Sequence, residues 1–222
     1  MDIRMIVLDM DGTLLTTQNT LTERTIRSVA ACIDRGIAVT VATGRVFHSV
    51  LPFAKELGLS DPLITANGAE IRAPGKEDAL FYRPIEKSLA REVLAFFREK
   101  GWYIQSYHDG RLFVDQADDR AKAYGRLTFL EPEPLGEALY TMDMEPVKLL
   151  SITSSPEEAV SVRKAVQKHF GGAIYAAVSN KLFVDMAHPE VSKAGGLRFL
   201  MDLEGIRRKE TMVVGDSEND IP

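Results

Sequence analysis

Apolar runs and helical patterns alternate along the first third of the chain. An apolar run from Met5 to Leu8 predicts a strand, and apolar residues at helical spacing after Thr22 predict a helix. The β-rich run from Ile37 to Val41 follows, then a helical pattern after Arg45 and a short strand from Leu63 to Thr65. Strands that alternate with helices predict a largely parallel sheet covered on both faces.

The first helix has a candidate capping signal. Thr20 and Glu23 have the spacing of a capping box, in which a threonine hydroxyl and a glutamate carboxylate satisfy the free N–H groups of the first turn. We therefore expect Thr20 to cap a helix that begins near Thr22. Gly36 is suited to end this helix.

From about Arg83 the pattern changes to a unit that occurs twice. The first copy is a helix that ends at Gly101, followed by a hairpin that turns at His108-Asp109-Gly110. The second copy is a helix from Pro156 to about Phe170, followed by a hairpin that turns near Asn180. Both hairpins contain the sequence Leu-Phe-Val-Asp, which supports a repeated helix-strand-strand unit.

Two prolines mark the limits of this repeated region. Pro84 lies where the pattern changes, and Pro189 lies where it changes back. We therefore predict a separate α+β domain over residues 83–188, inserted into a core formed by residues 1–82 and 189–222.

Composition places the chain among ordinary globular proteins. Its 222 residues are 45% hydrophobic and 27% charged, which excludes collagen-like and disordered classes. The formal charge of -5 argues against nucleic acid as a partner. The single cysteine, Cys32, cannot form an intrachain disulfide, and neither a signal segment nor a membrane-spanning run is evident. We expect a cytoplasmic protein without membrane partners, either a monomer or a weak homodimer.

The first of four polar stretches is Asp9-Met10-Asp11-Gly12-Thr13, directly after the first predicted strand. In an open parallel sheet such positions lie along the carboxyl edge, where ligands bind. Side chains two residues apart point the same way, so both carboxylates can face one cleft. Carboxylates this close repel each other unless a cation lies between them, and Mg²⁺ prefers such oxygen ligands. Taken alone, the stretch is also compatible with an acidic turn.

The other three stretches also follow predicted strands or begin predicted helices. Thr43-Gly44-Arg45 offers a hydroxyl and free backbone N–H groups to a phosphate oxygen, although a simple helix cap is the alternative. Lys193 follows the helix-capping Ser192, and a solvated surface lysine is the alternative. The last stretch runs from Gly215 to Asp220 after a strand predicted from Thr211 to Val214. It offers further carboxylates and an amide for a metal site, or forms a polar loop.

Several other motifs are missing from the sequence. It contains no G-x-x-x-x-G-K-[ST], no G-x-G-x-x-G and no G-x-S-x-G, which excludes P-loop, dinucleotide-binding and esterase motifs. Neither acidic stretch has the glycine that a calcium loop requires, and the four histidines lack zinc-ligand spacing.

In chain order the motifs resemble those of the haloacid dehalogenase superfamily, in particular its Cof-type sugar-phosphatase branch (type IIB, C2 cap). They are D-x-D-G-T, A-T-G-R, N-G-A at Asn67 to Ala69, V-S-K and G-D-S-x-N-D, and they extend from Asp9 to Asp220. The resemblance implies an α/β fold with a Rossmannoid parallel-sheet core and an inserted α+β cap of the C2 type. Relatives of this type continue for several tens of residues past the last acidic motif, so it also implies a core truncated at its C-terminal part.

The resemblance assigns a role to each motif residue. It implies that Asp9 is the nucleophile and a Mg²⁺ ligand, and that Asp11 is the general acid/base whose backbone carbonyl also binds the metal. The other implied roles are phosphate binding by the Met10 N–H, Thr43, Gly44 and Asn219, charge neutralisation by Lys193, Mg²⁺ coordination by Asp216, and support of the metal site by Asp220.

These roles describe a Mg²⁺-dependent phosphatase that hydrolyses small phosphorylated metabolites, sugar phosphates in particular, through an aspartyl-phosphate. An aspartate at position 11 favours hydrolysis over a long-lived phosphoenzyme. Two alternatives stay open: a phosphomutase of the same superfamily, and a phosphate-binding regulator without turnover. Arg45, Asn67, His108 and His188 are candidate substrate contacts, each equally compatible with a structural role.

Overall fold

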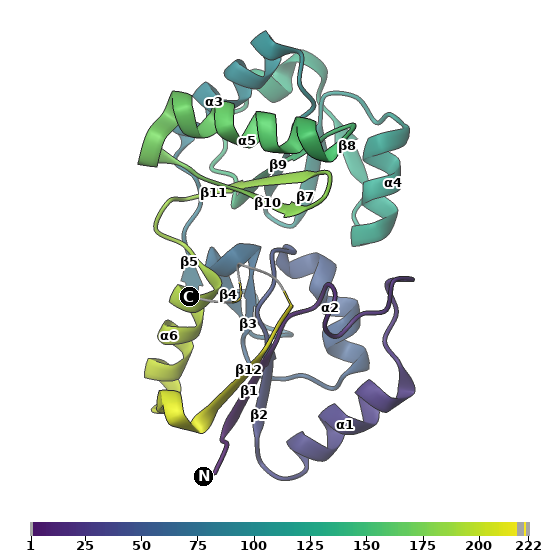
Figure 1. The fold of residues 1–222 in the computed structure, drawn as a ribbon, viewed down its shortest axis with the longest axis vertical. Helices are drawn as coiled ribbons and strands as arrows, with labels where there is room; N and C mark the ends of the chain where they lie inside the picture. The colour runs from purple at the N-terminus through teal and green to yellow at the C-terminus, as the bar shows by residue number, and fades with distance from the viewer. Residues whose placement is uncertain (1, 217–219, 221–222) are drawn as a thin grey trace. The chain divides into compact units, whose positions relative to one another are not determined.

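The chain forms two compact units in a computed structural model that describes residues 2–216 and 220 (Figure 1). The first unit comprises Met1–Tyr82 and Ser192–Pro222, and the second comprises Arg83–Val191. The second unit is therefore continuous in sequence, whereas the first is assembled from both ends of the chain.

The first unit is built on a parallel sheet. Its elements are β1 Met5–Leu8, α1 Glu23–Ile33, β2 Ala38–Val41, α2 Phe47–Glu56, β3 Leu63–Thr65, η1 Ala66–Gly68, β4 Glu70–Arg72, β5 Phe81–Tyr82, α6 Lys193–Glu204, η4 Arg208–Glu210 and β12 Thr211–Val214. Strands β12, β1 and β2 pair in parallel in that order, with Met5 opposite both Thr211 and Ala38. A parallel bridge between Ala42 and Ile64 joins β2 to β3, which continues into the antiparallel strands β4 and β5.

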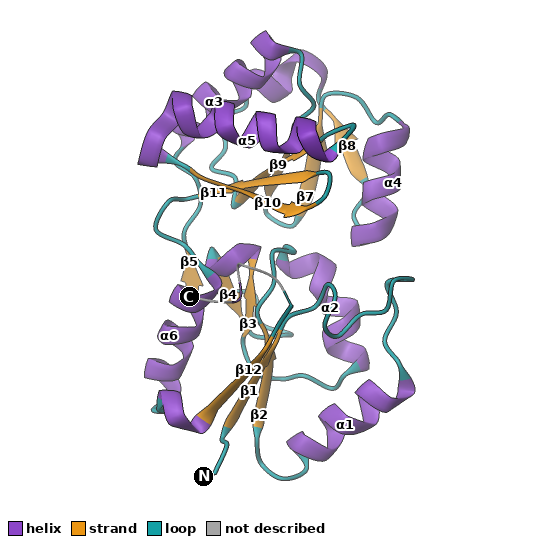
Figure 2. Cartoon of the chain, in the orientation of Figure 1, coloured by secondary structure: helices purple, strands orange, loops and turns teal. Residues whose placement is uncertain are grey.

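Alternating side chains on β1 explain why helices cover both faces of this sheet. Met5 and Val7 are buried in a cluster with α6, whereas Ile6 and Leu8 pack against the cluster formed with α1 and α2. Figure 2 shows α6 on one side of the strands and α1 and α2 on the other. A central parallel strand buried on both faces requires this arrangement. The predicted parallel sheet with helices on both faces is confirmed.

The cap of α1 differs from the sequence prediction. The Thr22 hydroxyl accepts a hydrogen bond from the Thr25 N–H at 3.1 Å, so Thr22 is the N-cap. The predicted Thr20–Glu23 capping box is wrong. Thr20 belongs to the preceding loop, where its hydroxyl lies 2.8 Å from that of Thr16.

The start of α6 is fixed by a cap and by a close backbone approach. The Ser192 hydroxyl accepts a hydrogen bond from the Gly195 N–H at 3.0 Å, which confirms the predicted cap. A Cβ atom at Gly68 would lie 2.3 Å from the Ser192 carbonyl oxygen, and Gly68 has a φ of +93°. Glycine is therefore required at position 68 for η1 to approach the end of α6 that carries Lys193.

The second unit is an antiparallel sheet with helices on one face. Its elements are α3 Lys87–Lys100, β6 Gln105–His108, β7 Arg111–Val114, α4 Asp119–Thr128, β8 Pro132–Pro134, η2 Gly136–Thr141, β9 Lys148–Ile152, α5 Pro156–Phe170, η3 Gly171–Ala173, β10 Tyr175–Asn180 and β11 Phe183–Ala187. The strand order is β10-β11-β9-β6-β7-β8, antiparallel except between β7 and β8. Helices α3 and α5 share one core cluster with this sheet. Within the described residues of both units, no helix has the length and apolar character needed to span a membrane.

The repeated helix-strand-strand unit is confirmed as α3-β6-β7 and α5-β10-β11. In the first hairpin, Asp109 and Gly110 have φ values of 47° and 72°, as a two-residue type I′ turn requires. Helix α4 and strand β8 were not predicted. Few large apolar residues mark α4, and β8 contains two prolines that only an edge strand tolerates.

Candidate active site

The structure brings four predicted site residues together within the first unit. Asp9 directly follows β1, Asp216 and Asp220 follow β12, and Lys193 is the first residue of α6. Because β1 and β12 are parallel neighbours, their carboxyl ends meet at one edge of the sheet. One carboxylate oxygen from each of Asp9, Asp216 and Asp220 lies within 4.8 Å of the others.

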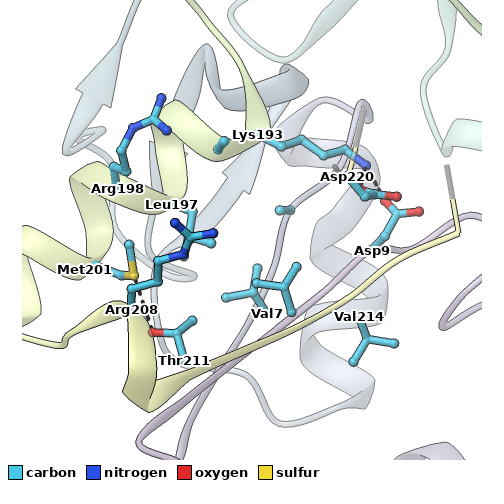
Figure 3. Close-up of a pocket in the computed structure, with 13 residues that line it drawn as sticks. Val7, Asp9, Lys193, Leu197, Arg198, Met201, Arg208, Thr211, Val214 and Asp220 are labelled. Atoms are coloured by element: carbon cyan, nitrogen blue, oxygen red, sulfur yellow. Dashed lines mark hydrogen bonds and ion pairs between the residues drawn. The ribbon is translucent and has the colours of Figure 1, made fainter. Parts of the chain in front are cut away.

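Lys193 lies between two of these carboxylates (Figure 3). Its Nζ donates hydrogen bonds to Asp9 Oδ1 at 2.7 Å and to Asp220 Oδ1 at 2.8 Å; the Lys193 and Asp9 side chains are buried and that of Asp220 is 9% exposed. Burial raises the pKa of the Asp9 carboxyl, while the charge and hydrogen bond of Lys193 act in the opposite direction. The group therefore contains one ammonium, that of Lys193, and three carboxylates, those of Asp9, Asp216 and Asp220.

This donor set fits a hard divalent cation. All the side-chain groups offered by Asp9, Asp216 and Asp220 are carboxylate oxygens, which Mg²⁺ prefers as ligands. Three carboxylates and one ammonium leave an excess of negative charge, and a divalent cation would neutralise it.

A cavity of about 460 Å³ adjoins these residues. Asp9, Lys193 and Asp220 line part of it, and Figure 3 shows Met201 farther along α6 and Arg208 at the start of η4. The buried carboxylates therefore border an open space within the first unit.

The Asp9–Thr13 turn is shaped around Asp216. Gly12 has a φ of +85°, and a Cβ atom at this position would lie 2.4 Å from Asp216 Oδ2. The Thr13 hydroxyl donates to Asp216 Oδ1 at 3.3 Å. Glycine at position 12 therefore allows both the turn and the approach of Asp216.

Arg45 holds the carboxylate of Asp11 through two hydrogen bonds. Arg45 Nε donates to Asp11 Oδ2 at 2.9 Å, and Arg45 Nη2 donates to Asp11 Oδ1 at 2.6 Å. The same Nη2 donates to Asn19 Oδ1 at 2.6 Å. From the sequence we expected Arg45 only as a candidate substrate contact, and its pairing with Asp11 was not predicted. The sequence feature that could have indicated this pairing is that the two residues follow neighbouring parallel strands, β1 and β2.

Thr43 and Gly44 lie in a turn that is hydrogen-bonded to the Asn67 turn. The Thr43 hydroxyl oxygen accepts from the Arg45 N–H at 3.2 Å, and the Thr43 carbonyl accepts from the Asn67 N–H at 2.9 Å. A Cβ atom at Gly44 would lie 3.2 Å from Asn67 Oδ1. The A-T-G-R and N-G-A stretches therefore form one connected pair of turns at the end of β2 and β3.

The remaining predicted residues have different positions. Met10 is buried, and its backbone N–H forms a hydrogen bond with the Asp9 carboxylate. Asn219 lies outside the described residues. His108 and His188 lie in the second unit, where each ring forms a hydrogen bond with a backbone group of that unit.

Comparison with known proteins identifies the family. Residues 6–222 match the family model of the haloacid dehalogenase-like hydrolases, and the chain belongs to this family. It is 28% identical over 233 residues to the 5-amino-6-(5-phospho-D-ribitylamino)uracil phosphatase YbjI of Escherichia coli, covering 100% of this chain and 81% of the relative. It is 25% identical over 228 residues to the HMP-PP phosphatase of Serratia proteamaculans, covering 98% of this chain and 78% of the relative.

Solved structures share the fold. A haloacid dehalogenase-like hydrolase from Bacteroides thetaiotaomicron superposes with a TM-score of 0.89 at 20% identity, covering 99% of this chain and 84% of that chain. A protein from Thermotoga maritima superposes with a TM-score of 0.82 at 25% identity, covering 98% and 81%. The predicted haloacid dehalogenase fold of Cof type is confirmed, and the protein is an enzyme, a phosphatase.

Proposed function

We propose that this phosphatase is a Mg²⁺-dependent phosphomonoesterase that hydrolyses small phosphorylated metabolites, sugar phosphates in particular, through an aspartyl-phosphate on Asp9. The observation that carries the proposal is the buried Asp9 carboxylate, held 2.7 Å from Lys193 Nζ and grouped with Asp216 and Asp220. Such a group combines a nucleophile with an adjacent ammonium, and its remaining negative charge is what a bound Mg²⁺ would neutralise before a phosphate dianion enters.

Asp9 supplies the nucleophile in the first step. Its carboxylate oxygen attacks phosphorus, a bond from Asp9 to phosphorus forms, and the bond from phosphorus to the leaving-group oxygen breaks. Lys193 offsets negative charge on the nucleophile and on the equatorial phosphate oxygens as they pass through the transition state. Its hydrogen bond to Asp220 at 2.8 Å holds the ammonium in place.

Asp9 and Asp216, with the backbone carbonyl of Asp11, would hold Mg²⁺, and Asp220 would support this group. When bound, the cation supplies charge neutralisation and polarises the phosphoryl oxygens. The Met10 N–H, Thr43, Gly44 and Asn219 would bind the phosphate. The oxygen of the Thr43 hydroxyl accepts a hydrogen bond from the Arg45 N–H. The hydrogen of the same hydroxyl is not used in this bond and can donate to a phosphate oxygen.

Asp11 moves the proton in both steps. It donates a proton to the leaving-group oxygen during the first step, and takes a proton from the water that attacks phosphorus in the second. General acid–base catalysis of this kind contributes roughly 10² to 10⁴ in rate. The second step releases phosphate and restores the Asp9 carboxylate.

The second unit would be the cap domain of this enzyme. The names of the relatives from Escherichia coli and Serratia proteamaculans describe phosphatases of small phosphorylated molecules, which supports a substrate of this size. We further propose that the enzyme acts in the cytoplasm as a monomer or weak homodimer, without nucleic acid or membrane partners.

A panel of phosphate esters tests the proposal. With Mg²⁺ we expect release of inorganic phosphate from sugar phosphates, complete loss of activity on chelation with EDTA, and recovery when Mg²⁺ is restored. Phosphate release and ³¹P NMR of the remaining substrate should be followed together. Equal rates with and without EDTA would contradict the Mg²⁺ requirement. Accumulation of an isomerised sugar phosphate would indicate a mutase, and a stable phosphoenzyme without phosphate release would indicate a regulator.

Gly12→Ala is expected to weaken the metal site through Asp216. The added Cβ atom would lie 2.4 Å from Asp216 Oδ2 and must displace that carboxylate. Because small displacements of reacting groups are costly, we expect kcat/KM to fall by about 10- to 100-fold. The Mg²⁺ concentration for half-maximal activity should rise.

Gly36→Ala is the matched control. Gly36 has a φ of +74°, and no heavy atom lies within 4 Å of an added Cβ atom. Gly36→Ala therefore introduces the same backbone strain as Gly12→Ala, about 1–2 kcal/mol, but does not touch Asp216. We expect it to retain the wild-type Mg²⁺ requirement. The same requirement in Gly12→Ala would show that Asp216 does not contribute to metal binding.

A further inference from the structure

The buried guanidinium of Arg45 forms two hydrogen bonds with the exposed carboxylate of Asp11 at the edge of the site. The Arg45 side chain is 8% exposed, whereas that of Asp11 is 61% exposed. The two hydrogen bonds, of 2.9 and 2.6 Å, engage both oxygens of the Asp11 carboxylate. Two parallel hydrogen bonds fix the plane of a carboxylate as well as its position. A freely exposed aspartate on a turn would have no such constraint.

Contacts on several sides hold Arg45 itself. Its backbone N–H donates to the Thr43 hydroxyl at 3.2 Å, and its carbonyl accepts from the Ala66 N–H at 2.7 Å. The guanidinium carbon lies 5.5 Å from the centre of the Phe53 ring, at cation–π distance. Arg45 is therefore anchored to the turn after β2, to η1 and to α2, which are parts of the folded core.

The loop after β1 completes this arrangement. Asn19, which adopts a left-handed conformation with a φ of 58°, presents its side-chain oxygen to Arg45 Nη2 at 2.6 Å. The loop is closed by hydrogen bonds from the Thr16 N–H to the Thr20 carbonyl at 3.0 Å and from the Asn19 N–H to the Thr16 carbonyl at 2.9 Å. One guanidinium nitrogen thus bridges Asn19 and Asp11.

We propose that Arg45 is a positioning residue that orients the Asp11 carboxylate for proton transfer. This inference rests on the proposed role of Asp11. Each carboxylate oxygen has two lone pairs, and the fork uses one on each, so a lone pair remains for the proton that Asp11 exchanges. The positioning requires the planar fork of arginine. Lysine would keep the charge but offers a single ammonium that cannot engage both oxygens in one plane.

The leaving group provides a readout specific to this role. A sugar alkoxide needs a proton as it departs, whereas p-nitrophenolate leaves readily without one. Since kcat/KM reports the steps up to departure of the leaving group, misorientation of Asp11 should lower it mainly for the sugar phosphate. For Arg45→Lys we expect kcat/KM to fall by about 10- to 100-fold with the best sugar phosphate of the panel. With p-nitrophenyl phosphate we expect a loss of less than about threefold.

A double-mutant cycle with Asp11→Asn tests whether Arg45 acts through Asp11. Asp11→Asn alone should lower kcat/KM for the sugar phosphate by about 10²- to 10⁴-fold. In that background, adding Arg45→Lys should cost less than about threefold further. Arg207→Lys is the matched control, because Arg207 forms a similar fork with Glu210 in the first unit, and it should leave kcat/KM unchanged with both substrates. Thermal unfolding of each variant verifies that it is folded.

The outcomes separate this inference from the proposed function. If the wild type releases no phosphate from any ester, the proposed function fails. If Asp11→Asn shows the leaving-group dependence and Arg45→Lys does not, the proposed function stands and the positioning role is overturned. Equal losses with both substrates, fully additive with Asp11→Asn, would also overturn it and indicate that Arg45 contacts the phosphate directly. Should Arg45→Lys fail to fold, Asn19→Ala, which removes the oxygen that Arg45 Nη2 contacts, must show the same leaving-group dependence in weaker form.

Discussion

Asp9→Asn is expected to abolish phosphatase activity. An amide cannot attack phosphorus, so the covalent route through Asp9 is closed although the side chain keeps its shape. Loss of a nucleophile that acts with its partners as a unit commonly costs at least about 10⁴ in kcat, and we expect a loss of this size with every phosphate ester. Release of inorganic phosphate with Mg²⁺, measured on freshly purified protein, provides the readout.

Asp61→Asn is the control for this substitution. Asp61 Oδ2 accepts a hydrogen bond from the Val39 N–H at 3.0 Å, a bond that an asparagine oxygen can replace. This variant makes the same chemical change near the other end of β2 and should keep wild-type activity. If Asp9→Asn also kept wild-type turnover, Asp9 would not be the nucleophile.

Lys193→Met should produce the second largest loss. It removes the ammonium that contacts both Asp9 and Asp220, so the transition state loses a charge aimed at the nucleophile and phosphate. Loss of one preorganised electrostatic contact of this type costs about 10² to 10³ in kcat. The variant also removes the ion-pair partner of the buried Asp9 carboxylate, and we expect the free energy of unfolding to fall by up to about 3 kcal/mol.

Lys148→Met separates the loss of stability from the loss of catalysis. Lys148 forms a buried ion pair with Asp185 in the second unit, so its removal should destabilise the protein by a similar mechanism. Urea unfolding and formation of the phosphoenzyme from p-nitrophenyl phosphate should be measured on both variants. Lys148→Met should still form the phosphoenzyme and Lys193→Met should form it slowly. Equal phosphoenzyme formation in the two variants would contradict the role of Lys193.

Local sequence signals predicted most of the main elements of the fold. The apolar runs at β1, β2 and β12 are short and β-rich, and β1 and β2 have residues in the clusters on both faces of the sheet, whereas Met212 and Val213 of β12 are each 49% exposed. Ser192 and Gly101 mark helix ends through a side-chain cap and a left-handed conformation, and both effects depend only on neighbouring residues. Such signals are readable because they do not require knowledge of distant contacts.

Elements that depend on tertiary pairing were missed. Strands β4 and β5 have three and two residues, and their pairing with β3 stabilises them more than their own composition does. Helix α4 buries only the small residues Ala121, Gly125 and Thr128, so its sequence lacks a strong apolar period. Thr20 and Thr22 were both able to cap α1, and the hydrogen-bonded loop around Thr16 decides between them.

The grouping of the site residues follows from strand order. Once β1 and β12 are parallel neighbours, Asp9 and the acidic stretch after β12 must share an edge. The contact between Arg45 and Asp11 is different, because it depends on which of several carboxylates a long side chain reaches. Strand order places the two residues on neighbouring strands, but only side-chain packing around Phe53 and Asn19 directs the guanidinium to Asp11.

Trapping of the covalent intermediate tests the central claim, that Asp9 is phosphorylated during turnover. Asp11→Asn should form the phosphoenzyme from p-nitrophenyl phosphate with Mg²⁺ but hydrolyse it slowly, since the second step lacks its base. Acid quenching, reduction with borohydride and mass spectrometry of the tryptic peptide of residues 5–24 would then locate the acyl phosphate. The account predicts reduction of the side chain at position 9 and no reduction when Asp9→Asn is added. Nitrophenol release with the modification on another residue, or with no modified residue, would contradict it.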